Sequence, residues 1–105
     1  MLDDAQAWTL VRQVRDRIAS GGDEVRWDSD IAHLDDLASR LKELDLPAAL
    51  LVVGDGVHVE VDDTLALAED VLEWCDFIVA QDASWALFRD LGSGLCWQLV
   101  LLPVA

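Results

Sequence analysis

The spacing of apolar residues near the start of the chain predicts an amphipathic helix over residues 4–19. Apolar side chains recur there at intervals of three and four positions, as they do on one face of a helix. These positions are Ala7, Trp8, Val11, Val14 and Ile18. Asp3 or Asp4 can cap the first turn, and Gly21-Gly22 provides a stop.

The same spacing predicts a second helix over residues 31–45, which Pro47 would end. Its apolar stripe consists of Ile31, Leu34, Leu37, Ala38, Leu41 and Leu44. Asp28-Ser29-Asp30 is the expected cap cluster. Residues 24–27 alternate with a period of two, which indicates either a short edge strand or an ordered loop.

Residues 48–61 carry the pattern of a β-hairpin. The apolar run Ala49–Val53 is followed by Gly54-Asp55-Gly56, which can supply the positive φ angles of a tight turn. An alternating segment then follows. We expect Val57, Val59 and Val61 on the core face of this strand, and His58 and Glu60 on the opposite face.

A third helix is predicted over residues 64–76, capped by Asp62-Asp63-Thr64, with Leu65, Ala68, Val71, Leu72 and Cys75 as its buried stripe. The last third of the chain predicts three strands. They cover residues 77–81, 84–89 and 95–102, with a turn at 91–94. Residues 84–89 also fit a short helix capped by Asp82, but the strand is favoured.

Strands joined by short turns must run antiparallel. We therefore expect one α+β domain spanning residues 1–105. It would have an antiparallel sheet of about five strands, a hairpin plus a three-strand meander, with two or three helices packed on one face.

Composition narrows the function classes. The chain has 105 residues, is 53% hydrophobic, and carries a formal net charge of −14. The apolar fraction excludes intrinsic disorder as the default, and the charge excludes a general phosphate-contacting surface. We therefore expect no direct nucleic-acid or membrane binding. No apolar run is long enough for a transmembrane helix, and the start of the chain is acidic where signal peptides are basic, so we expect a cytoplasmic location.

Few residues offer catalytic chemistry. His58 with Glu60 and Asp62 is the minimum set for a general base or a weak metal site. The chain has two histidines, and no third ligand has a fixed spacing, so the solvent face of a strand is the competing interpretation. Cys75 and Cys96 lie in apolar surroundings and are expected to be reduced and buried. We expect no enzymatic activity, no metal and no cofactor.

The placement of charge is the most informative feature. Residues 47–105 contain one basic residue, Arg89, against ten acidic ones. Six of these acids follow the predicted third helix and its cap: Asp62, Asp63, Glu69, Asp70, Glu73 and Asp76. Such a surface speeds capture of a cationic partner. The five tryptophans of the chain offer anchors for an interface.

These features favour a small acidic protein that neutralises or chaperones a basic protein. An immunity protein or antitoxin against a nuclease-type toxin is the concrete form, because carboxylates can stand in for substrate phosphates. A solvated face that maintains solubility, or an adaptation to salt, is the competing interpretation of the same carboxylates.

A second hypothesis rests on element order. Over residues 48–105, the succession of hairpin, helix and three-strand meander resembles the profilin-like and roadblock layout, although two helices precede it here where such domains have one. Roadblock domains are small dimeric modules that regulate GTPases, so the resemblance implies a self-associating regulatory or scaffold domain. The apolar C-terminal strand, with Trp97, Leu99, Leu101 and Val104, would then form the homodimer contact.

Overall fold

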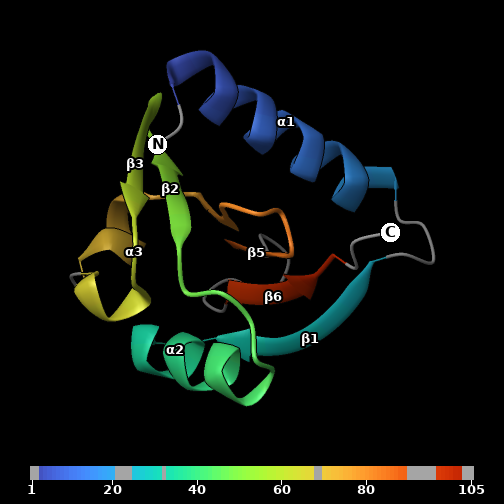
Figure 1. Ribbon diagram of the computed structural model, residues 1–105, viewed down its shortest axis with the longest axis vertical. Helices are drawn as coiled ribbons and strands as arrows, with labels where there is room; N and C mark the ends of the chain where they lie inside the picture. The colour runs from blue at the N-terminus through green and yellow to red at the C-terminus, as the bar shows by residue number, and fades with distance from the viewer. Residues whose placement is uncertain (1–2, 21–24, 32, 68–69, 90–96, 103–105) are drawn as a thin grey trace.

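The strands of the described residues join one sheet, as the computed structural model shows (Figure 1). The structure describes residues 3–20, 25–31, 33–67, 70–89 and 97–102. The helical elements are α1 (Asp4–Ser20), α2 (Leu34–Glu43), the 3₁₀ turn η1 (Thr64–Ala66) and α3 (Val71–Trp74). The strands are β1 (Arg26–Ile31), β2 (Leu50–Gly54), β3 (Val57–Val61), β4 (Phe77–Ala80), β5 (Trp85–Arg89) and β6 (Trp97–Leu101).

The sheet has six strands in the order β1-β6-β5-β4-β2-β3, and every neighbouring pair is antiparallel. The predicted α+β class, the hairpin and the three-strand meander β4-β5-β6 are therefore confirmed. The expected number of about five strands is too low. Residues 24–27 were left open as strand or loop. Glu24 lies outside the described residues, and Arg26 and Trp27 begin β1, which pairs with β6 and adds a strand at one edge. The predicted turn at 91–94 lies outside the described residues.

The first helix begins as predicted. Asp3 caps it, because its Oδ1 accepts a hydrogen bond from the backbone N–H of Gln6 at 2.7 Å. The Gln6 side chain returns the contact, accepting the backbone N–H of Asp3 at 3.0 Å. This reciprocal capping box satisfies two donors that the first turn would otherwise leave open.

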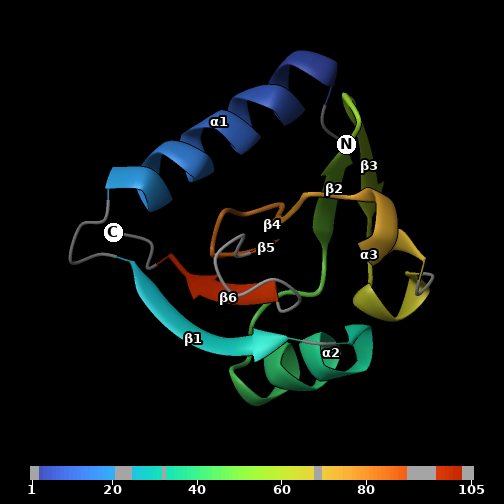
Figure 2. The same ribbon diagram turned by 180° about the vertical axis from the view of Figure 1, so that it is seen from behind.

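Helices cover both faces of the sheet, so the prediction that they pack on one face is wrong (Figures 1 and 2). One face packs against α1 in a cluster that includes Ala7, Val11, Val14, Leu51, Val53, Phe77, Val79, Ala86 and Val100. The other face packs against α2 and the segment around α3, in a cluster that includes Leu34, Leu37, Leu41, Leu50, Val52, Cys75, Ile78, Trp85 and Leu99. The physical reason is that β2 and β4 are apolar at every position and are buried at every residue, so both of their faces need a cover.

The second helix starts later than predicted. Ile31 ends β1, and α2 begins at Leu34. The expected cap cluster Asp28-Ser29-Asp30 lies within β1 instead. The register of β1 against β6 shifts between Trp27 and Asp30, as it does at a β-bulge.

The bulged strand places Asp28 against α2. Its two carboxylate oxygens accept hydrogen bonds from Nε and Nη2 of Arg40 at 2.7 and 2.8 Å. Arg40 also donates to Glu43 at 2.9 Å, and these two sets of hydrogen bonds raise the pKa of Arg40 above its ordinary value. A bidentate guanidinium–carboxylate contact fixes orientation as well as distance. It therefore fastens α2 to the edge strand β1.

The hairpin forms at the predicted turn, but its second strand faces the opposite way. Asp55 (φ 52°) and Gly56 (φ 75°) form the two-residue turn. Directly opposed residues share a face, and Val53 opposes His58 while Val52 opposes Val59. His58 therefore points to the α1 side, where its side chain is 19% exposed. Val57 and Val59, expected in the core, are 54% and 44% exposed.

The predicted third helix is not continuous. Between β3 and β4 the structure has the 3₁₀ turn η1 and the single helical turn α3, and residues 68–69 lie outside the described part. Both β3 and β4 are antiparallel to β2, so this segment has to run back along β2. From first to last residue β2 spans about 13 Å. A continuous helix over residues 64–76 would rise about 20 Å, which is more than the return path requires.

The end of this segment packs tightly on the hairpin. A Cβ built on Gly54 would lie 2.5 Å from the carbonyl oxygen of Trp74 and 2.7 Å from Cα of Cys75. The Cys75 side chain is buried in the α2-side core, as expected, whereas Cys96 lies outside the described residues. Asp76 then donates its backbone N–H to the carbonyl of Val53 at 2.9 Å, which starts β4 beside β2. In the part of the chain that is described, no helix has both the length and the apolar character needed to cross a bilayer.

Candidate functional site

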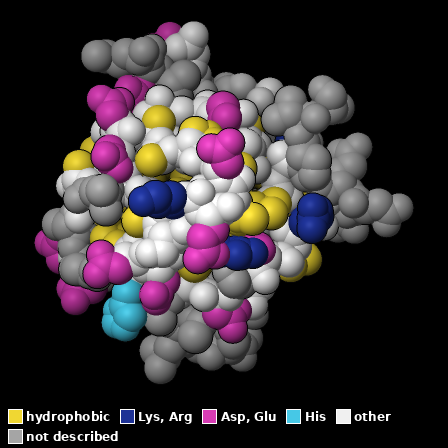
Figure 3. Space-filling view, turned by 60° about the horizontal axis from the view of Figure 1, so that its bottom comes forward, with side chains coloured by type: hydrophobic (Ala, Val, Ile, Leu, Met, Phe, Trp, Pro, Cys, Tyr) yellow, Lys and Arg dark blue, Asp and Glu magenta, His cyan; other side chains and the backbone are white. Residues whose placement is uncertain are grey.

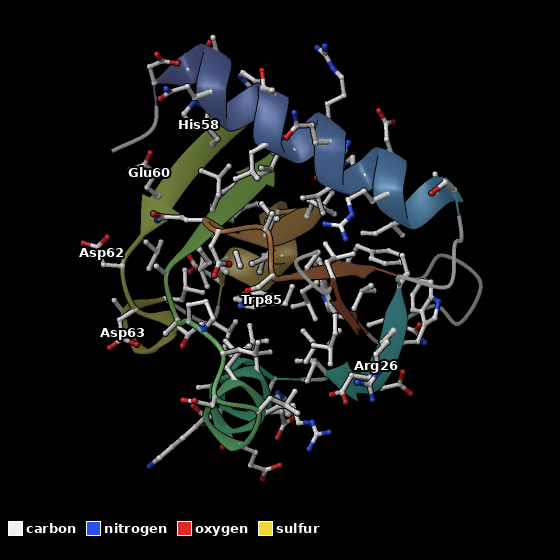
Figure 4. All side chains as sticks on the ribbon, turned by 45° about the vertical axis from the view of Figure 1, so that its right-hand side comes forward. Arg26, His58, Glu60, Asp62, Asp63 and Trp85 are labelled. Carbon is white, nitrogen blue, oxygen red and sulfur yellow. The ribbon has the colours of Figure 1, made fainter. Side chains whose placement is uncertain are left out.

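Four of the six predicted site carboxylates lie in the described part of the segment between the end of β3 and the end of α3. Asp62 and Asp63 directly follow β3 and are exposed. Asp70 precedes α3 and Glu73 lies within it, and both are exposed. Glu69 lies outside the described residues. Figure 4 shows Glu60, Asp62 and Asp63 pointing outward along this edge of the molecule.

Asp76 is separated from this group. Its carboxylate accepts a hydrogen bond from Nη2 of Arg15, a residue of α1, at 3.2 Å. The guanidinium of Arg15 also lies 4.8 Å from the centre of the Phe77 ring, on the α1 side of the sheet. The predicted row of six acids on one helix is thus divided, because the segment turns into β4 after Cys75.

The carboxylates around η1 and α3 have few cations near them. No Lys or Arg occurs between Lys42 and Arg89, a span that contains β2, β3, η1, α3 and β4. Within the described residues, no ion pair is seen for Asp62, Asp70 or Glu73. In Figure 3 one coloured Lys or Arg side chain lies left of centre and the others lie at the centre and right, while the left margin, on the side where η1 and α3 lie in Figure 1, shows carboxylates. Asp62, Asp70 and Glu73 therefore form a region with a single sign of charge, whereas Asp63 also borders a groove that Lys42 lines.

Exposed apolar side chains lie beside these carboxylates. Trp74 is 38% exposed, and its ring comes within 3.0 Å of a Cβ built on Gly54. Gly54 is the cross-strand partner of Val57, so Trp74 lies on the same face of the sheet as Val57 and Val59. We call the group Val57, Val59, Asp62, Asp63, Asp70, Glu73 and Trp74 the β3–α3 surface.

Sequence reasoning assigned Val57 and Val59 to the core and so missed the apolar part of this surface. Their exposure follows from the position of β3 at the edge of the sheet, which the residues of β3 do not reveal. The tryptophan content led us to expect anchors for an interface, and these side chains differ in how far they reach the surface. Of the five tryptophans, Trp85 and Trp97 are buried, Trp8 is half-buried, and Trp27 and Trp74 are exposed.

His58, the candidate general base or metal ligand, does not lie on a solvent-facing side of β3 as expected. Its Nε2 lies 2.9 Å from Oδ1 of Asp4. The Trp8 indole N–H donates to the same oxygen at 3.2 Å, and the two rings meet edge to face at 5.6 Å. Asp4 and Trp8 both belong to α1, so this contact holds the first turn of α1 against the edge strand β3.

No metal-binding group emerges around His58. Among the described residues, no three His, Cys, Asp or Glu side chains are placed to hold a metal ion together.

An open groove of about 490 Å³ lies between α2 and η1, and its lining mixes Lys42 with Asp45 and Asp63. Its charges are of both signs, and it contains neither histidine nor cysteine.

The C-terminal strand is in the interior of the sheet. β6 pairs with β1 on one side and with β5 on the other. Trp97 and Leu99 are 3% and 0% exposed, and Val104 lies outside the described residues. A second copy could pair with β6 only after β1 had left the sheet, so this arrangement gives no support to a homodimer through the C-terminal strand.

Comparisons with protein-family models, with curated proteins and with solved structures find no match to this chain.

Proposed function

We propose that this protein is a small cytoplasmic protein that binds and neutralises a basic protein through the β3–α3 surface. The proposal is of the immunity-protein or antitoxin type, with a nuclease-type toxin as the concrete partner. The observation that carries it is the group of exposed carboxylates around η1 and α3, in a span of chain without Lys or Arg, beside an exposed tryptophan.

The physical basis is complementarity of charge. Clustered carboxylates with few neighbouring cations repel one another, and a cationic partner relieves this repulsion. A nuclease site that binds phosphates presents the positive charge that such carboxylates fit. Trp74, Val57 and Val59 supply apolar area, which stabilises a complex after electrostatic attraction has brought the partners together.

Reversing charge on the surface is expected to abolish tight binding. The variant Asp62→Lys/Asp70→Lys/Glu73→Lys changes three exposed carboxylates of the β3–α3 surface. At about 1 kcal/mol per exposed charge, affinity for the basic partner should fall about 100-fold. The measurement is capture from the source organism's lysate with elution by a salt gradient, followed by titration calorimetry on the purified basic partner.

A matched control separates this surface from the total charge. Asp16→Lys/Asp35→Lys/Asp36→Lys makes the same change in net charge at exposed positions of α1 and α2. This control should bind within about threefold of the wild type. Equal losses in both triple variants would mean that only the overall field matters. Unchanged binding by the surface variant would remove the proposal.

The alternative function is a self-associating regulatory or scaffold domain. Because β6 lies in the interior of the sheet, the C-terminal strand does not support this function. β3 lies at one end of the strand order and is therefore a better candidate for contact with a second copy.

A further inference from the structure

We infer that the outer edge of β3 pairs with β3 of a second copy of this chain, antiparallel and centred on Val59. The two sheets would then continue into one another across a two-fold axis. This inference goes beyond the proposed function and does not depend on it. It rests on the direction of the backbone groups of β3, on its exposed valines and on the order of its residues.

The backbone of β3 is arranged for such pairing. In a hairpin closed by a two-residue turn, the residues that flank the turn form a hydrogen-bonded pair, and such pairs recur at every second position. Gly54 and Val57 flank the turn here. Val57, Val59 and Val61 therefore direct their N–H and C=O groups toward β2. His58 and Glu60 direct theirs toward the outer edge of the sheet.

The two edges of the sheet differ in how they are protected. At the β1 edge the register is irregular between Trp27 and Asp30, and the strand carries Arg26, Asp28 and Asp30. Bulges and charges of this kind discourage pairing with another chain. The register of β3 is regular from Val57 to Val61, and two of its valines are about half exposed. Of the two edges, β3 is the one suited to accept another strand.

The sequence of β3 selects a second copy as the partner strand. Val57-His58-Val59-Glu60-Val61 is self-complementary when it is read against itself in the antiparallel direction. Val59 lies opposite Val59 of the second copy, and Val57 lies opposite Val61. His58 lies opposite Glu60, so an imidazole faces a carboxylate on the other face of the sheet.

This register also satisfies the pattern of hydrogen bonds. His58 and Glu60 of opposite copies form the hydrogen-bonded pairs, each exchanging both N–H···O bonds, and Val59 forms a non-hydrogen-bonded pair at the axis. A shift by one step would set Glu60 against Glu60 or His58 against His58. Glu60 is half-buried and keeps contacts within its own chain. The pairing requires only its backbone direction and its negative charge.

Because both copies are strongly acidic, we expect the dimer to become tighter as the salt concentration rises. Two chains of net charge −14 repel each other, and salt screens that repulsion. The burial of valines and the backbone hydrogen bonds are not screened in the same way. The dimer should therefore become tighter between about 0.1 M and about 1 M salt, over which the Debye length falls from about 10 to about 3 Å.

A disulfide trap tests the register directly. At the two-fold axis, opposed Cα atoms of a non-hydrogen-bonded pair lie about 4.5 Å apart, which is within the range of a disulfide. Val59→Cys should therefore form a covalent dimer under mild oxidation, seen on non-reducing gels. In Val57→Cys the two introduced thiols would be about 13 Å apart along the strands and should not join. The wild type, treated alongside, reports any contribution from Cys75 and Cys96.

A second variant tests the equilibrium. Val59→Lys sets two like charges against each other at the axis and should weaken dimerisation more than about tenfold in sedimentation equilibrium. Val59→Thr keeps the β-branched shape without charge and should stay within about threefold of the wild type. Circular dichroism should show that both variants fold, because Val59 is exposed and its replacement does not disturb the core.

Three results would overturn the inference. One is a wild type that remains monomeric at every concentration and salt tested. Another is a dimer that Val59→Lys leaves intact, which would place the contact on a different surface. The third is covalent trapping through Val57→Cys but not through Val59→Cys, which would establish a different register.

Discussion

Trp85→Ala should lower the free energy of unfolding by about 3–5 kcal/mol, as large-to-small changes of core aromatic residues do. Trp85 is 0% exposed and packs in the core between the sheet and α2. Its indole N–H donates to the carbonyl oxygen of Pro47 at 2.9 Å, in the connection from α2 to β2. The substitution removes both the apolar volume and this hydrogen bond. A protein of this size is stable by about 5–15 kcal/mol, so the loss is a large fraction of the total.

Urea unfolding followed by far-ultraviolet circular dichroism measures this loss without depending on tryptophan fluorescence. Trp85→Phe keeps much of the volume but leaves the Pro47 carbonyl without its donor, so it should cost about 1–3 kcal/mol. Trp27→Ala is the matched control, because Trp27 is 54% exposed and contacts the Phe88 ring at 5.3 Å. It should cost about 1 kcal/mol. Similar losses for Trp85→Ala and Trp27→Ala would contradict the position of Trp85 in the core.

Gly54→Ala should destabilise the protein by about 3 kcal/mol, at the upper end of what overpacking usually costs. The added methyl group would meet the Trp74 carbonyl oxygen at 2.5 Å and Cys75 Cα at 2.7 Å. Both are backbone atoms, so no change of side-chain rotamer can relieve the contact. The chain between α3 and β4 would have to move away from β2. That movement would disturb the hydrogen bond from Asp76 N–H to the Val53 carbonyl.

The neighbouring glycine provides the control. A Cβ on Gly56 would meet nothing within 4 Å, but its φ is +75°. Gly56→Ala should therefore cost only the backbone strain, about 1–2 kcal/mol. Hydrogen exchange should show faster exchange of the Asp76 amide in Gly54→Ala than in Gly56→Ala. Equal stability of the two variants, with equal exchange at Asp76, would mean that α3 does not press on the hairpin.

The two binding proposals respond to salt with opposite signs. A complex between the β3–α3 surface and a basic protein should weaken as salt rises, because screening reduces attraction. Pairing of two acidic copies should strengthen, because the same screening reduces repulsion. Val59 takes part in both proposals, so Val59→Lys reports on dimerisation only when self-association is measured without the basic partner. The opposite responses to salt then distinguish failure of one proposal from failure of the other.

The sequence by itself determined the elements that depend on interactions between residues close together in the chain. The apolar spacing in residues 4–19 and the Asp3 cap predict α1 almost to its ends. The turn at Asp55-Gly56 follows from residues that tolerate positive φ, and the hairpin follows from that turn. The strands β4 and β5 were predicted from short apolar runs. The acidic character of the segment around η1 and α3 was also readable, because charge is counted directly from the residues.

Only the tertiary structure decided which face each element presents. Alternation separates Val59 from His58, but it does not say which of them meets the core. That choice depended on the register with β2 and on α1, whose Asp4 and Trp8 enclose His58. The unbroken apolar run of β2 was a local sign that both faces of the sheet are covered. The edge position of β3 was decided by pairings between residues distant in sequence, which no short window of residues contains.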